Sequence, residues 1–107
     1  MSSETITFGG FIATSRQLVG LNQKELAKLV KMKDGRPISA QYLSDIENNR
    51  RNPSSSFLIE QFTTLLKVDK DYLYYLAGRV PEDIVDRTLN QGEFSHAMLA
   101  FRKSLDK

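Results

Sequence analysis

The chain has 107 residues, of which 40% are hydrophobic and 26% charged, with a formal net charge of +2 and no cysteine. This length suits one small domain with or without a helical extension, in an ordinary globular protein. The lack of cysteine excludes disulfides and thiolate metal sites and suits a reducing compartment. Residues 1–7 show no signal-peptide pattern and no long apolar run predicts a membrane span, so we expect a cytoplasmic protein.

Positive charge is concentrated in the middle of the chain. Residues 24–51 contain seven Lys or Arg and four acidic residues, a local charge of +3. Residues 69–107 contain six basic and seven acidic residues, a local charge of −1. A basic region of this kind suits a surface that faces phosphate, although an ordinary solvated face would show the same bias.

The first predicted helix covers about residues 8–19 and ends before Gly20. Phe8 and Ile12 are expected to face inward, and Phe11 and Val19 are further candidates.

Three later helix starts share one local pattern. A capping residue (Asn22, Ser39 or Asp69) is preceded by an apolar residue and followed four positions later by another, and Glu25 completes a capping box after Asn22. The pattern predicts helix starts near residues 23, 40 and 70.

The helix that starts near 70 is expected to continue through residues 72–76. The remaining predicted helices cover about residues 56–67 and 93–105, and one more begins with Pro81 as its first residue and breaks at 90–92. The serines at 54–56 are expected to cap a helix. No segment alternates convincingly as a strand, so we predict an all-α fold.

The helices near 23 and 40 have the features of a helix-turn-helix. Leu26, Leu29 and Val30 are expected to form the apolar face of the first helix, as Leu43 and Ile46 do for the second. Ala27 is small enough for two helices to cross closely. Such a pair places its second helix outward.

The outward side of the second helix carries short polar groups. With Leu43, Ile46 and Glu47 inward, the exposed positions, termed here the recognition face, are Ala40, Gln41, Ser44, Asp45 and Asn48. An amide can pair with adenine, a methyl group can contact thymine, and a carboxylate can accept from cytosine. The basic neighbours expected to contact phosphate are Lys31, Lys33, Arg36, Arg50 and Arg51.

Taken in order, residues 23–27, 38–48 and 51–53 resemble the signature of phage repressor and Cro-like regulators of the xenobiotic response element type. The resemblance covers about residues 8–76 and implies a five-helix DNA-binding domain over residues 1–78. It implies that Gln23 contacts the DNA backbone or a base and that Asn48 contacts phosphate. Residues implied to face the major groove are Ser39, Ala40, Gln41, Ser44 and Asp45. It also implies a structural ion pair between Arg16 and Glu47.

Two features depart from that family's usual pattern. Residues 31–37 insert about six extra residues before the second helix, either as a basic wing or as a loose surface loop. Asp45 lies on the recognition face, where it either recognises cytosine or only holds Arg50 or Arg51.

Residues 79–107 form a predicted helical extension with an apolar stripe, termed here the C-terminal stripe: Phe94, Met98, Phe101 and Leu105. The stripe either packs on its own domain or dimerises across a two-fold axis, which we favour because groove-binding modules of this size gain affinity from two half-sites. Tyr72 and Tyr75 are also assigned to a dimer or partner interface. His96 is the only histidine and is expected to be a surface or interface residue and not a metal ligand.

We therefore expect a sequence-specific transcriptional repressor that binds a double-stranded operator as a homodimer and is nucleoid-associated. The alternative is an antitoxin or adaptor that holds a partner protein through its C-terminal region. One histidine, no cysteine and no glycine-rich phosphate loop argue against an enzyme, and no metal or other cofactor is expected.

Overall fold

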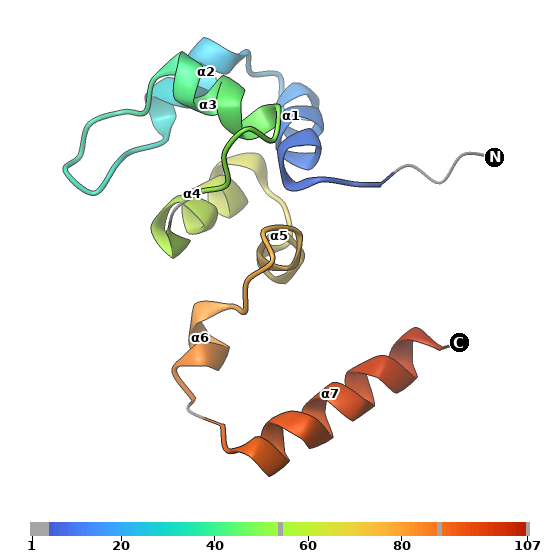
Figure 1. The fold of residues 1–107 in the computed structure, drawn as a ribbon. Helices are drawn as coiled ribbons and strands as arrows, with labels where there is room; N and C mark the ends of the chain where they lie inside the picture. The colour runs from blue at the N-terminus through green and yellow to red at the C-terminus, as the bar shows by residue number, and fades with distance from the viewer. Residues whose placement is uncertain (1–4, 54, 88, 107) are drawn as a thin grey trace.

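The computed structural model describes residues 5–53, 55–87 and 89–106. Seven helices occur within these residues, and the only β-type pairing there is one isolated bridge. The helices are α1 (Phe8–Leu18), α2 (Gln23–Leu29), α3 (Ala40–Glu47), α4 (Ser56–Leu66), α5 (Lys70–Leu76), α6 (Glu82–Val85) and α7 (Gln91–Leu105), as Figure 1 shows. The predicted all-α class is confirmed.

The three helix starts predicted from capping patterns are confirmed. The Asn22 side chain accepts a hydrogen bond from the Glu25 amide at 2.8 Å, and the Glu25 carboxylate accepts from the Asn22 amide at 2.8 Å. Ser39 and Asp69 each accept from the backbone amide three residues later, at 2.9 and 2.8 Å. Each side chain satisfies an amide that has no partner within its helix.

Several predicted boundaries after residue 54 are wrong. Asn90 does not break a helix but begins one, because its side chain accepts from the Glu93 amide at 2.8 Å in a second capping box. Pro81 precedes α6 as its cap, and α6 ends at Val85. Ser55 stands at the start of α4 without a side-chain capping bond, and Ser54 lies outside the described residues.

Helices α1 to α5 surround one hydrophobic core. Phe8 and Phe62 meet edge to face within it, with ring centroids 6.4 Å apart. The other buried apolar residues are Ile12, Leu26, Ala27, Val30, Ile38, Leu43, Ile46, Leu58, Ile59, Leu66, Leu73 and Tyr74. The inward placement predicted for Leu29 and Val19 is wrong, because these side chains are 47% and 37% exposed at the ends of α2 and α1.

Helices α1 and α3 approach each other closely at Gly9. A Cβ atom at this position would meet the carbonyl oxygens of Ile46 and Glu47. The Gly9 amide donates to Asn49 Oδ1 at 3.0 Å, and Asn49 Nδ2 donates to Thr7 Oγ1 at 2.9 Å. Asn49 adopts a left-handed φ of 61°, which this side chain tolerates better than most. The contact seats the end of α3 on the start of α1.

Helix α5 is joined to α4 through Tyr74. Its hydroxyl donates to Glu60 Oε2 at 2.9 Å, and burial raises the pKa of the Tyr74 hydroxyl, with the Glu60 carboxylate adding to the effect. Just after α5, Arg79 Nη2 donates to Ser56 Oγ at 3.3 Å. These two hydrogen bonds hold α5 and the residues just after it against α4.

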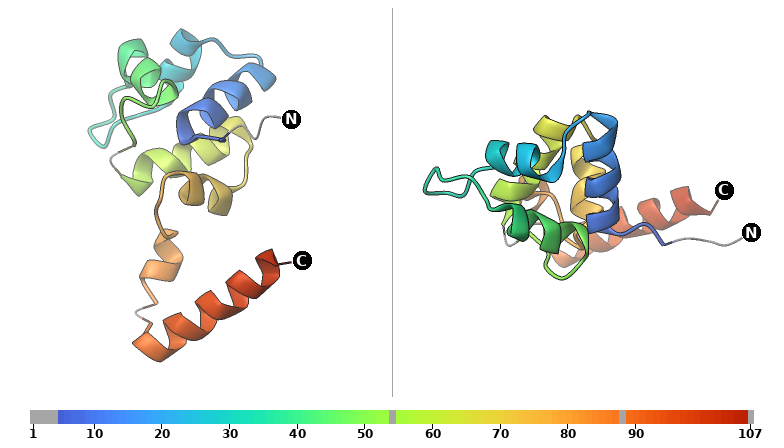
Figure 2. Two further views of the ribbon diagram at one scale, coloured as in Figure 1. Left: turned by 45° about the vertical axis from the view of Figure 1, so that its right-hand side comes forward. Right: turned by 90° about the horizontal axis from the view of Figure 1, so that it is seen from above.

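Helices α6 and α7 lie outside the core of α1 to α5, as the views in Figures 1 and 2 show. None of their described residues is buried. No described helix is long and apolar enough to cross a membrane.

Candidate nucleic-acid interface

A buried polar cluster joins the first three helices. Arg16 of α1 donates to both oxygens of Glu47 in α3, at 2.7 Å from Nε and 3.1 Å from Nη2. Its third nitrogen donates to the carbonyl of Leu21 at 2.9 Å. Gln23, the first residue of α2, donates to Glu47 Oε1 at 2.8 Å. The Arg16–Glu47 pair is confirmed, and Gln23 adds a link that its assignment to DNA contact did not anticipate.

The recognition face of α3 is accessible, as the sequence predicts. Gln41 and Asn48 are exposed, and Ala40, Ser44 and Asp45 are half-buried. On the opposite side of α3, Leu43, Ile46 and Glu47 are buried. Ser39 is exposed at the start of α3, where its hydroxyl caps the helix. The small polar groups therefore point away from the protein interior.

Asp45 organises its neighbours on this face. Its Oδ1 atom accepts from Gln41 Nε2 at 3.0 Å and from Arg50 Nη1 at 3.3 Å. Within the described part of the chain, Oδ2 accepts no hydrogen bond. Of the two roles expected for Asp45, the contact with Arg50 is present, and Oδ2 stays available as an acceptor beside the Gln41 amide.

Tyr42, which the sequence analysis did not single out, supports one of the flanking arginines. The Arg51 guanidinium lies 4.7 Å from the centroid of the Tyr42 ring, a cation–π geometry. An aromatic residue in the first turn of α3, with arginines shortly after the helix, is the sequence signal that could have identified Tyr42.

Asn48 also has a partner on the recognition face. Its Nδ2 donates to the Ser44 carbonyl at 2.9 Å and to Ser44 Oγ at 3.3 Å.

Residues 31–37, termed here the wing, form a hydrogen-bonded hairpin. An antiparallel bridge joins Lys31 and Pro37, and the Met32 amide donates to the Arg36 carbonyl at 2.7 Å. At the tip, the Gly35 amide donates to the Met32 carbonyl at 2.9 Å, and Gly35 has a left-handed φ of 87°. Asp34 Oδ1 accepts from the Arg36 amide at 2.9 Å. A three-residue hairpin turn with glycine in this conformation is a common type.

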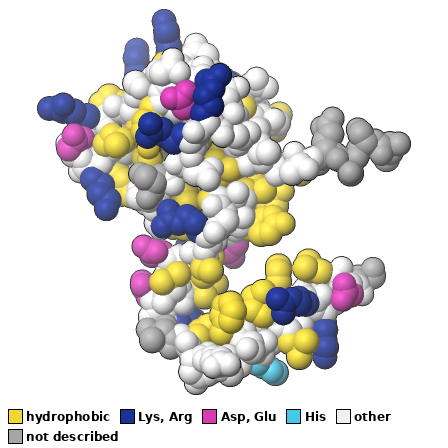
Figure 3. Space-filling view, in the orientation of Figure 1, with side chains coloured by type: hydrophobic (Ala, Val, Ile, Leu, Met, Phe, Trp, Pro, Cys, Tyr) yellow, Lys and Arg dark blue, Asp and Glu magenta, His cyan; other side chains and the backbone are white. Residues whose placement is uncertain are grey.

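The three cations assigned to the wing have different surroundings. Lys31 turns back toward α2, where its ammonium donates to the Lys28 carbonyl at 2.7 Å. Lys33 is exposed, and the Arg36 side chain is 86% exposed with its Nε 3.9 Å from Asp34 Oδ2. Figure 3 shows Lys and Arg side chains spread over the α2–α3 end of the molecule and the wing. Lys33 and Arg36 are therefore more accessible to a phosphate than Lys31.

The C-terminal stripe is exposed. Phe94 and Phe101 are each 50% exposed, Leu105 is 66% exposed, and Met98 is half-buried. None of the four side chains is buried, so the structure leaves much of the stripe uncovered. Figure 3 shows apolar side chains along the side of α7 that faces the rest of the molecule.

The two tyrosines assigned to an interface lie at the end of the core. Tyr72 meets Phe11 edge to face, with centroids 5.2 Å apart, and stacks on Tyr75 at 6.0 Å. Tyr75 is 67% exposed and Tyr72 half-buried. The two rings on α5 therefore form an aromatic contact that runs from the edge of the core, at Phe11, to the protein surface, at Tyr75.

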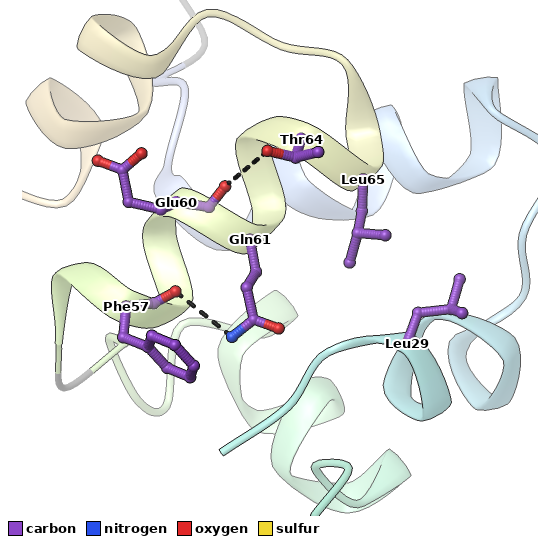
Figure 4. Close-up of a pocket in the computed structure, with 6 residues that line it drawn as sticks. All are labelled: Leu29, Phe57, Glu60, Gln61, Thr64 and Leu65. Atoms are coloured by element: carbon purple, nitrogen blue, oxygen red, sulfur yellow. Dashed lines mark hydrogen bonds between the residues drawn. The ribbon is translucent and has the colours of Figure 1, made fainter. Parts of the chain in front are cut away.

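An open hollow of about 350 Å³ lies away from the recognition face, between α2 and α4. Figure 4 shows the residues that line it: Leu29, Phe57, Glu60, Gln61, Thr64 and Leu65. In the described part of the chain no three His, Cys, Asp or Glu residues are grouped so that they could hold a metal ion.

Comparison with known families gives one result. A helix-turn-helix family model matches residues 12–73, which is more than half of the chain and includes α2, the wing and α3. Comparisons with curated proteins and with solved structures give no significant match.

Proposed function

The chain belongs to the Cro/C1-type helix-turn-helix family of DNA-binding transcriptional regulators, and on this premise we propose that it is a sequence-specific repressor that binds its operator as a homodimer. The observation that carries the proposal is the recognition face of α3. It combines an exposed amide, a carboxylate, a hydroxyl and a methyl group on one accessible side of a short helix. Base edges in the major groove are recognised by such groups.

In this proposal Gln41 and Asp45 act together on neighbouring bases. Asp45 Oδ1 engages one N–H of the Gln41 amide, so the other N–H and Oε1 can pair with the N7 and N6 atoms of adenine. Asp45 Oδ2 is oriented by the same contacts and can accept from cytosine N4. Ala40 and Ser44 complete the surface that enters the groove.

Phosphate contacts are assigned to the groups around this face. Arg50 and Arg51 are placed by Asp45 and Tyr42, and Lys33 and Arg36 extend from the wing. Further contacts are assigned to Gln23, Ser39, Asn48 and Lys31. Backbone contacts set register and orientation, while base contacts set the sequence.

Dimerisation is assigned to residues 79–107, with residues 1–78 as the DNA-binding unit. The exposed C-terminal stripe supports this division, because an apolar helix side of this length is usually covered. Its residues recur at spacings of four and three, as in paired helices. A two-fold pair would present two copies of α3 to successive major grooves.

The same exposed stripe supports a second candidate, an antitoxin or adaptor whose C-terminal region holds a different protein. A purified chain that remains monomeric at micromolar concentration and binds a single half-site would favour this candidate. The two functions are compatible in one protein.

Selection of bound duplexes from a random library, using the full chain, tests the proposal. We expect enrichment of a palindrome whose half-sites are about one helical turn, roughly 10 base pairs, apart. Enrichment of a single asymmetric site would contradict the homodimer, and no enrichment would contradict sequence-specific binding.

A further inference from the structure

Gln61 of α4 bonds to both backbone groups of Lys31, the first residue of the wing. Its Oε1 accepts from the Lys31 amide at 2.7 Å, and its Nε2 donates to the Lys31 carbonyl at 2.7 Å. The same Nε2 also lies 3.4 Å from the Phe57 carbonyl, one turn earlier in α4. A single side chain thus satisfies the backbone of Lys31 as a neighbouring strand would.

Figure 4 shows the Gln61 side chain and its bond to the Phe57 carbonyl. The Gln61 side chain extends from α4 beside Leu29 of α2 and Leu65, along the hollow between the two helices. Helix α4 is anchored in the core by Leu58, Ile59 and Phe62, which are all buried. The base of the wing is therefore attached to a helix that is held in the core.

The wing needs such an anchor because its own hydrogen bonds are few. It has one antiparallel bridge and a three-residue turn, and an isolated hairpin of two strands is marginally stable in water. Its tip residues are exposed. The flanking residues Val30 and Ile38 are buried, and the Ile38 amide donates to the Val30 carbonyl at 2.9 Å, so Gln61 adds a second attachment one residue farther toward the tip that carries Lys33 and Arg36.

We propose that Gln61 is a positioning residue for DNA binding, which fixes the wing so that Lys33 and Arg36 meet backbone phosphates beside the groove that α3 enters. The inference rests on the proposed function. A wing that is already ordered loses less conformational entropy when it binds. Gln61 itself does not touch DNA in this arrangement.

The first measurement needs no DNA. In Gln61→Leu, which keeps the bulk but removes both hydrogen bonds, we expect the Lys31 amide to lose its protection from hydrogen exchange. Thr64→Ala, one turn later on the exposed side of α4, is the matched control and should leave that protection unchanged. Gln61→Glu keeps an acceptor for the Lys31 amide but loses the donor to the Lys31 and Phe57 carbonyls, and it should show a smaller loss. Unchanged protection in Gln61→Leu would overturn the proposal.

The second measurement is the salt dependence of binding to the selected operator. Each phosphate contact contributes about 0.9 to the slope of log K against log salt concentration. We expect Gln61→Leu and Lys33→Ala/Arg36→Ala each to reduce the slope by about one to two per bound subunit, with no further reduction when they are combined. Base preference should remain that of the unsubstituted protein.

The outcomes separate the inference from the proposed function. If Lys33→Ala/Arg36→Ala reduces the slope and Gln61→Leu does not, Gln61 is not a positioning residue. If neither variant changes the slope while the unsubstituted chain still selects its operator, the inference and the phosphate contacts assigned to Lys33 and Arg36 both fail, whereas sequence-specific binding through α3 stands. Only a chain that selects no sequence would contradict the proposed function itself.

Discussion

Arg16 of α1 and Glu47 of α3 form a buried ion pair, with Nε and Oε2 2.7 Å apart and side chains only 11% and 4% exposed. Gln23 of α2 donates to the same carboxylate. One carboxylate therefore connects α3 to both α1 and α2, and these contacts set the orientation of α3. Because Glu47 faces inward, the recognition face on the other side of α3 is left to contact a ligand.

Arg16→Met should lower the free energy of unfolding by about 3–5 kcal/mol, since it leaves the Glu47 carboxylate buried and unpaired. The double variant Arg16→Met/Glu47→Leu should recover much of this loss, because no isolated charge remains. Urea unfolding measures both. Arg50→Met removes an exposed ion pair and serves as the control, with little change in stability expected. Additive losses in the double variant would contradict this account.

Gly9→Ala should destabilise the protein by about 1–3 kcal/mol, because the new methyl group overlaps backbone oxygens of α3 that cannot move independently. Thermal unfolding monitored by circular dichroism measures the change. Gly92→Ala is the control, since a Cβ there has only an ordinary contact with Asn90 Oδ1 at 3.5 Å. Equal melting temperatures for the two variants would show that α1 and α3 can separate without cost.

Gln41→Ala should change which bases are preferred, with a loss of about 1–3 kcal/mol on the selected operator and little loss on unrelated DNA. Arg51→Ala should instead weaken binding to all sequences similarly and reduce the salt slope by about one per bound subunit. Binding titrations on both duplexes at several salt concentrations distinguish the two. Equal losses on every sequence for both variants would refute the recognition role of Gln41.

Asp45→Asn should strengthen binding to unrelated DNA and reduce discrimination, because it removes a negative charge from the recognition face. It also weakens the contacts that order Gln41 and Arg50. The ratio of the dissociation constants for unrelated and selected duplexes is the measurement. A ratio that stays constant would mean that Asp45 neither recognises a base nor positions Gln41.

Phe101→Glu should shift the protein toward the monomer, since it places a charge within the C-terminal stripe. Sedimentation at several concentrations measures the equilibrium. His96→Glu, on the side of α7 about opposite the stripe, is the control and should leave association unchanged. A dimer unaffected by Phe101→Glu would place the interface elsewhere.

Features set by neighbouring residues could be predicted from the sequence. The caps at Asn22, Ser39 and Asp69 involve residues three positions apart, so their spacing predicts the helix starts directly. The same spacing is present at Asn90 and Glu93, where the sequence analysis predicted a break at 90–92 instead of a helix start. The recognition face follows from helical periodicity in the same way.

Other features depended on the tertiary structure. Gln61 and Lys31 are 30 residues apart, and Gly9 meets α3 nearly forty residues away, so no local pattern indicates either contact. The exposure of Leu29 was decided by where the neighbouring helices end, because apolar periodicity marks a helix side but not how far the core extends along it. Local sequence thus determined which helices form and which side of α3 is polar. Packing between distant segments decided how that helix is held and which charges surround it.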